Sequence, residues 1–181
     1  MKGTPMKFVQ IILVAVVVLA ATAHVAPAEG TKPINLSLFD PIQIFKNDTA
    51  IHGVRLNIYG KNAELKGIDL GIANFITGDV VGLQHGVVNV VKGDFTGWQA
   101  GPVQVTEGFM KGLQSGMIYS RNGSGKGLMA SGLNWSDDFI GLQFGIVNYA
   151  ITINGIQLGL INIIKEGGML PFFPIFNFSF K

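Results

Sequence analysis

Apolar residues alternate with glycine and amide residues in a unit that returns every 14 or 15 residues from Gly53 almost to the C-terminus. Its full form is Gly-Leu-Gln-x-Gly-x-x-Asn. The copies start at Gly53, Gly67, Gly82, Gly97, Gly112, Gly127, Gly141 and Gly155. A fixed period of this length indicates a repeat array, in which each unit buries its apolar surface against its neighbours.

Each unit also predicts its own local structure. Counted from the first glycine, position two is apolar in every copy, and positions six and seven are mostly apolar. Positions eleven to thirteen carry turn residues, such as Lys92-Gly93-Asp94, because glycine accepts positive φ and Asp bonds its own backbone. With no helical period, the pattern predicts one or two short strands closed by a turn, and therefore an all-β fold.

Two all-β architectures fit such a unit. In a β-solenoid, equivalent positions stack about 4.8 Å apart, and the Gln and Asn columns become amide ladders. In a small up-and-down outer-membrane β-barrel, each unit is one strand of about 10 residues plus a tight turn. A straight strand from Gly82 would put Gln84 and Asn89 on opposite faces, leaving no amide-free face for lipid. We therefore predict a β-solenoid of about eight 14–15-residue repeats with terminal caps, with the barrel as the alternative.

The two ends of the chain suggest further segments. Phe176, Phe178 and Phe180 alternate along the C-terminus, as in the last strand of a barrel or in an aromatic cap, and the prolines at 171 and 174 favour the cap. The predicted organisation is a signal peptide at 1–23, an N-terminal capping segment at 24–52, the repeat array at 53–168 and an aromatic C-terminal cap at 169–181.

The N-terminus has the features of a secretory signal peptide. Lys2 and Lys7 precede an apolar run over 11–21, and small residues then predict cleavage before His24 or after Ala28. The alternative is an uncleaved membrane anchor, although a spanning helix needs about 20 apolar residues. The chain has no Cys, so export brings no disulfide framework.

Charge argues against nucleic acid as a partner. The chain has 13 basic and 11 acidic side chains, and removal of Lys2 and Lys7 with the leader leaves equal numbers. Binding to phosphates needs clustered Lys and Arg. Only 13% of residues are charged and 48% are hydrophobic, which indicates much buried or lipid-facing surface.

The titratable residues form no recognisable site. The histidines, His24, His52 and His85, lie at unrelated positions of the pattern, so we expect no metal site. Asp137 and Asp138 occupy a turn, whereas a glycosidase needs two carboxylates across a cleft. The sequence therefore disfavours a polysaccharide hydrolase built on that pair.

One further candidate site does not match its motif, and another keeps two interpretations. The segment 123–127 lacks the first glycine and the Ser or Thr of a phosphate-binding loop. Trp98 and Trp135 are interpreted as core residues, with stacking on a sugar as the alternative. The sequence thus predicts no catalytic, cofactor-binding or metal-binding residues, and no enzyme.

The repeat units, the Gly-Asp turns and the ending from Leu170 to Phe178 resemble the bacterial surface-repeat proteins of spirochaetes and other Gram-negative groups, over about residues 53–180. Gln104, Tyr119, Met129 and Ser131 depart from the pattern. The resemblance implies export and association with the cell surface or outer membrane. It transfers no functional residues, since the family has no assigned reaction or ligand.

These observations together predict an exported, non-enzymatic repeat protein. We expect it at the outer membrane or cell surface, with the periplasm as the alternative location, in a structural or binding role. Its partner would be an unknown ligand or a component of the cell envelope, and not nucleic acid. If the barrel forms instead, the alternative function is a pore or an anchor.

Overall fold

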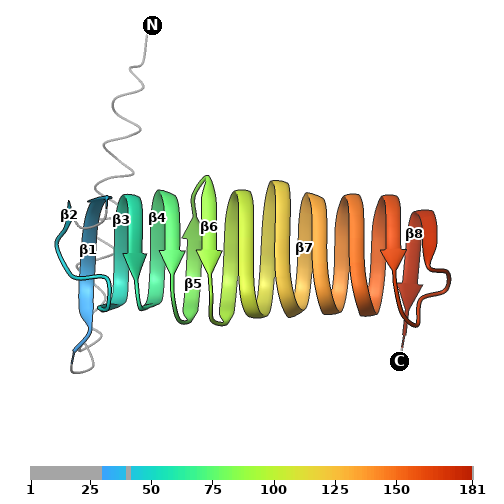
Figure 1. The fold of residues 1–181 in the computed structure, drawn as a ribbon, viewed down its shortest axis with the longest axis horizontal. Coiled ribbons are helices and arrows are strands. Elements are labelled where there is room, and N and C mark those ends of the chain that lie inside the picture. The colour runs from blue at the N-terminus through green and yellow to red at the C-terminus, as the bar shows by residue number, and fades with distance from the viewer. Residues whose placement is uncertain (1–29, 40–41, 181) are drawn as a thin grey trace, which may run out of the picture.

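The computed structural model describes residues 30–39 and 42–180. The predicted signal peptide over 1–23 lies outside these residues. Within them the chain forms strands, turns and bends, and no helix. The strands are β1 (Lys32–Phe39), β2 (Ile42–Gln43), β3 (Ala50–Asn62), β4 (Glu64–Ile76), β5 (Val80–His85), β6 (Val88–Val91), β7 (Phe95–Ile164) and β8 (Phe172–Ser179). The 70-residue β7 is continuous because it winds through successive coils without a break (Figure 1).

Neighbouring repeats pair in parallel and in register. Gly53 pairs with Gly67, Gly67 with Gly82, and Gly82 with Gly97. The described chain is therefore a β-solenoid whose coils stack along one axis, as predicted (Figure 1). The barrel alternative is wrong, because an up-and-down barrel requires antiparallel neighbours.

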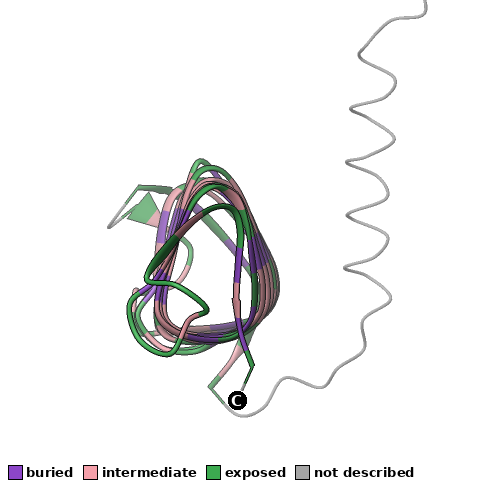
Figure 2. Ribbon diagram, turned by 90° about the vertical axis from the view of Figure 1, so that its right-hand side faces the viewer, coloured by how far each residue is buried: buried purple, intermediate pink, exposed green. Residues whose placement is uncertain are grey.

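A bend in the middle of each unit directs both amide columns inward. In the coil that starts at Gly82, β5 ends at His85 and β6 begins at Val88. The bend between them resets the alternation of side chains, so Gln84 and Asn89 are both fully buried. The sequence predicted one or two short strands in each unit, and the coil from Gly82 has two. The straight strand considered for the barrel, with an amide on each face, does not form. Seen along the axis, each coil is a closed loop with rounded corners (Figure 2).

The rest of the interior is an apolar core that runs along the stack. Leu65, Val80, Phe95 and Met110 are buried at equivalent positions of successive coils, and Leu65 to Phe95 pair in register. Each coil thus buries apolar side chains beside its Gln and Asn, which gives the narrow interior both dispersion contacts and hydrogen bonds.

Glycine at position one has a specific backbone role. Gly82 has φ 138° and Gly97 has φ 134°, in the region that favours glycine. A Cβ on Gly97 would overlap the carbonyl oxygen of Gly82 in the coil before it, and the same relation recurs along the column. Position five differs: most of its glycines lack this conformation and instead leave room for the Asn side chains.

Strands outside the array cover both ends of the stack. β1 pairs in parallel with β3, and β2 pairs antiparallel with β1. At the other end, β8 runs antiparallel to the last coil, with Ser179 opposite Gly155 and Phe172 opposite Ile163. These strands occupy the backbone edges that an uncovered coil would leave unpaired.

Candidate functional site

The Gln residues at position three form a buried ladder. Gln99 Nε2 donates to Gln84 Oε1 at 2.7 Å, and Gln114 Nε2 donates to Gln99 Oε1 at 2.8 Å. The ladder resumes where Gln157 Nε2 donates to Gln143 Oε1 at 2.7 Å. All of these residues are 0% exposed. The predicted amide ladder is confirmed, and these amides are bound to one another rather than available to a ligand.

The Asn residues at position eight form a second ladder. Asn74 Nδ2 donates to Asn89 Oδ1 at 2.7 Å, and Asn148 Nδ2 donates to Asn162 Oδ1 at 2.8 Å. Each donor also bonds a carbonyl of the following coil, as Asn148 does to Leu158 O at 2.9 Å. The side chain thereby satisfies a backbone carbonyl at the bend, where the strand ladder is interrupted.

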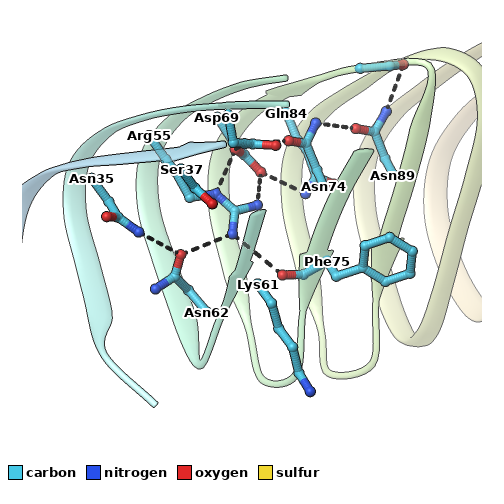
Figure 3. Close-up of polar contacts among 12 residues, drawn as sticks. Asn35, Ser37, Arg55, Lys61, Asn62, Asp69, Asn74, Phe75, Gln84 and Asn89 are labelled. Carbon is cyan, nitrogen blue, oxygen red and sulfur yellow. Dashed lines mark hydrogen bonds and ion pairs between the residues drawn. The ribbon is translucent and has the colours of Figure 1, made fainter. Parts of the chain in front are cut away.

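A buried ion pair replaces the amides at the N-terminal end of the Gln column. Arg55 Nε donates to Asp69 Oδ1 at 2.8 Å, and a terminal guanidinium nitrogen lies 2.7 Å from Asp69 Oδ2. Both side chains are fully buried. Asn62 Oδ1 accepts from Arg55 at 3.1 Å, and Gln84 donates to Asp69 Oδ2 at 2.9 Å. Figure 3 shows the pair joined to the amide ladder on one side and to Asn35 on the other (Figure 3).

Sequence reasoning missed this pair, although a signal existed. Arg55 and Asp69 both occupy position three and lie 14 residues apart, so stacking alone brings opposite charges together. The arrangement is bidentate and saturated with hydrogen bonds, which is what a buried ion pair needs to persist. We therefore interpret the ion pair as structural, because it joins the Gln ladder to the first coils of the stack.

Both ladders are modified in the middle coils, where the sequence departs from the pattern. Met129 takes the Gln position, and its sulfur accepts from Asn122 at 3.2 Å and from Gln143 at 3.5 Å. In the Asn column the buried residue is Ser120 and not Tyr119, so our alignment was wrong by one residue there. Ser120 bonds Gln104 Oε1 at 2.8 Å and also contacts the Ser131 hydroxyl.

The titratable candidates are dispersed over the structure. His24 lies outside the described residues, His85 is exposed, and His52 lies 3.3 Å from Glu64. Asp138 is exposed and accepts from Thr152 at 2.5 Å. Within the described residues no three His, Cys, Asp or Glu side chains are grouped to hold a metal.

Glu64 carries a perturbed pKa on the surface. Its carboxylate lies 2.7 Å from Lys66 Nζ, and its side chain is 35% exposed. The hydrogen bond from Lys66, and a smaller one from His52, lower the pKa of Glu64 against the opposing effect of burial. Glu64, Lys66 and His52 thus form a charged contact on the surface, and their arrangement indicates no catalytic reaction.

The two tryptophans lie on the outer surface, so their interpretation as core residues is wrong. Trp98 is 49% exposed, and its Nε1 donates to Ser115 Oγ at 2.7 Å. Trp135 is 37% exposed and stacks on Tyr149 with ring centroids 4.0 Å apart. Burial raises the pKa of Tyr119, which also lies on the outside of its coil.

The outer surface has two edges of opposite character. The apolar edge is the corner formed around position six, and it consists of Ile58, Ile72, Val87, Pro102, Met117, Ile118, Gly132, Ile146 and Leu160. The charged edge is the corner at positions eleven to thirteen, and it consists of Glu64, Asp79, Lys92, Asp94, Glu107, Asp137, Asp138, Lys165 and Glu166. The candidate functional site is thus the extended outer surface that carries these two edges.

Searches against family models, curated proteins and solved structures found no match for this chain. The assignment of a function therefore depends on the geometry described above and on the resemblance carried by the repeat unit.

Proposed function

We propose that this chain is an exported, non-enzymatic repeat protein that associates with the outer membrane or the cell surface and has a structural or binding role. The observation that carries the proposal is the internal bonding of the repeat. The Gln and Asn columns bond along the stack and are fully buried, so the recurring polar groups of the unit face no substrate. Each coil can therefore contact a partner through its outer surface.

The proposed location depends on the N-terminal sequence and on the resemblance to surface-repeat proteins. Among the residues that the structure describes, no helix has the length and apolar character needed to cross a bilayer. Association with the envelope would therefore use the surface of the solenoid or the N-terminal segment. A role as a pore depended on the barrel and is withdrawn with it.

Cell fractionation tests the proposal. The full chain and a variant without residues 1–23 are expressed in a Gram-negative host, and each fraction is probed for the protein. We expect the full chain in the envelope or on the surface, accessible to protease added to intact cells, and the truncated variant in the cytoplasm. A full chain that stays in the cytoplasm would contradict the proposal.

Enzyme activity needs a separate measurement. A glycan hydrolysis panel is run with the wild-type chain and with an Asp137→Asn/Asp138→Asn variant. We expect no turnover by either protein. Hydrolysis that is lost in the variant would replace the binding role with the hydrolase hypothesis.

A further inference from the structure

The apolar edge is exposed in most units of the array, and Pro102 and Gly132 are its half-buried members. Met117 is 78% exposed, Leu160 69% and Ile146 58%. At about 4.8 Å per coil, the edge runs for roughly 34 Å from the first unit to the last. A row of exposed apolar side chains of this length marks an interaction site.

Formal charge is excluded from this edge. Positions four to seven contain no Asp, Glu, Lys or Arg in any unit, and His85 is the one histidine there. The charged edge lies at the far end of β6, a strand of four residues that spans about 13 Å. Most coils are therefore amphipathic across their section and are oriented the same way, although the units that start at Gly112 and Gly141 carry no charge at positions eleven to thirteen.

Aromatic residues with a polar group border the apolar edge. The chain has two Trp and three Tyr. They occupy positions two (Trp98), seven (Tyr59), eight (Tyr119) and nine (Trp135 and Tyr149), all within four residues of position six. Trp and Tyr gather where an apolar layer meets water, since the ring prefers the apolar side and the NH or OH the polar side.

The edge continues across both caps. Ser37 pairs with Asn57, which places the next residue, Leu38, beside Ile58, and Leu38 is 55% exposed. At the other end Ile175 pairs with Gly159 and is 72% exposed. An open apolar groove of about 540 Å³ lies at the N-terminal end of the edge, and Leu36, Leu38, Ile42, Ile44, Leu56 and Ile58 line it. Caps that only ended the stack would present polar outer faces.

We propose that the solenoid lies with its axis along a lipid surface and inserts the apolar edge into the acyl region just below the headgroups. This inference rests on the proposed envelope function and names its partner. The coils have rounded, convex outer corners (Figure 2), and the edge lies where the chain turns between β5 and β6, so two copies facing each other would touch only along a line. Acyl chains deform around a convex ridge, and an interfacial element buries its apolar side about 5–10 Å deep.

The charge distribution sets the expected lipid dependence. The edge has no cationic cluster, and the chain without its leader has equal numbers of acidic and basic groups. Binding should then follow apolar burial and be the same for neutral and anionic headgroups, at low and at high salt. This behaviour separates the edge from a basic amphipathic surface.

Vesicle flotation with the exported chain tests the inference. The probes are phosphatidylcholine vesicles with and without phosphatidylglycerol. The edge variant is Ile146→Gln/Leu160→Gln, and the matched control is Val81→Gln/Ile140→Gln, which changes side chains 44% and 47% exposed outside the edge. We expect the edge variant to lose binding at least about tenfold, with the control within about twofold of wild type.

A measurement on the wild-type chain makes the test independent of variant folding. Brominated phosphatidylcholine should quench Trp98 and Trp135 at the border of the edge. Absence of flotation or of quenching, equal loss in both variants, or binding that needs anionic lipid would each overturn the inference. A dimer that the edge variant dissociates, with no vesicle binding, would assign the edge to a second copy. None of these outcomes alters the fractionation result, so the two proposals fail separately.

Discussion

At the residue scale, the Asp69 carboxylate is the most heavily bonded group of the interior. It accepts from Arg55 through both oxygens, from Gln84 at 2.9 Å and from Asn57 at 3.2 Å. The guanidinium has no access to water, so its charge is compensated by this one carboxylate. Removal of one partner leaves a buried uncompensated charge, which costs far more than the intact pair contributes.

Asp69→Asn should therefore lower the free energy of unfolding by about 3–5 kcal/mol, measured as a lower urea midpoint. The double variant Arg55→Gln/Asp69→Gln places the usual residue of position three in both coils and should recover most of the loss. A double variant as unstable as the single one would show that the ion pair is needed for more than charge compensation.

Glu64 gives a prediction for pH. Its lowered pKa means that the folded chain gains stability above the ordinary Glu value and loses it as pH falls through the depressed folded pKa. Glu64→Gln should lower the free energy of unfolding at neutral pH by less than about 1 kcal/mol, because the pair is partly exposed, and this is measured as a slightly lower melting temperature. The difference should vanish in acid and shrink at high salt. A difference that grows toward acid pH would contradict the assignment.

At the element scale, the bend between positions four and seven determines which residues enter the interior. It lets Gln84 and Asn89, five residues apart, point to the same side. Position five carries glycine because the Asn ladder passes over it: a Cβ on Gly145 would overlap Ser131 O and approach Asn134 Nδ2. The backbone and the ladder therefore constrain each other.

Gly145→Val should destabilise the chain by more than about 3 kcal/mol, since the overlap is with backbone that cannot move without breaking the coil contact. Thr152→Val in the same coil removes one exposed hydrogen bond to Asp138 and should cost less than about 1 kcal/mol. Thermal unfolding of both variants measures the difference. Equal melting temperatures would contradict the assigned positions.

Much of the structure of the repeat unit was predictable from the spacing of its Gly, Gln and Asn residues. The repeat starts, the parallel stack and the amide columns follow from a period that holds Gln and Asn at fixed offsets. The bend was not, because the spacing does not show where a strand turns. For the same reason it did not show that positions two and nine, where Trp98 and Trp135 lie, face outward. The shift from Tyr119 to Ser120 was hidden because the 15-residue unit accommodates the extra residue without changing the next start.

The apolar edge escaped sequence reasoning for the same reason. Positions six and seven were identified only as mostly apolar, and the bend places position six on the outer surface. The composition gave a partial signal, since few charges and many apolar residues indicated lipid-facing surface. It could not indicate which residues supply that surface, because this depends on where each coil turns.

At the scale of the whole molecule, the fold is a sum of equivalent contacts between adjacent coils. Adjacent coils bond through the backbone and, where the pattern holds, through Gln and Asn, and the described chain adds closing strands at both ends. Stability in such a stack is approximately additive over neighbours. Whether a deletion is tolerated should then depend on whether it keeps the repeats in register, more than on how many residues it removes.

This reasoning predicts that deletion of one whole unit, residues 82–96, is tolerated. Gly97 would then stack on Gly67, and Gln99 would meet Asp69 as Gln84 does now. We expect a folded chain with β-type circular dichroism, shortened by about 4.8 Å in solution scattering, and less stable by one inter-coil contact.

The matched control is deletion of residues 82–88, which removes fewer residues but half a unit. It places strand against bend, breaks both amide ladders at one step and leaves buried amides unpaired, so we expect it to unfold or aggregate. If the shorter deletion were the better tolerated one, adjacent coils would not be recognising each other through position-specific columns, and the additive description of the stack would be wrong.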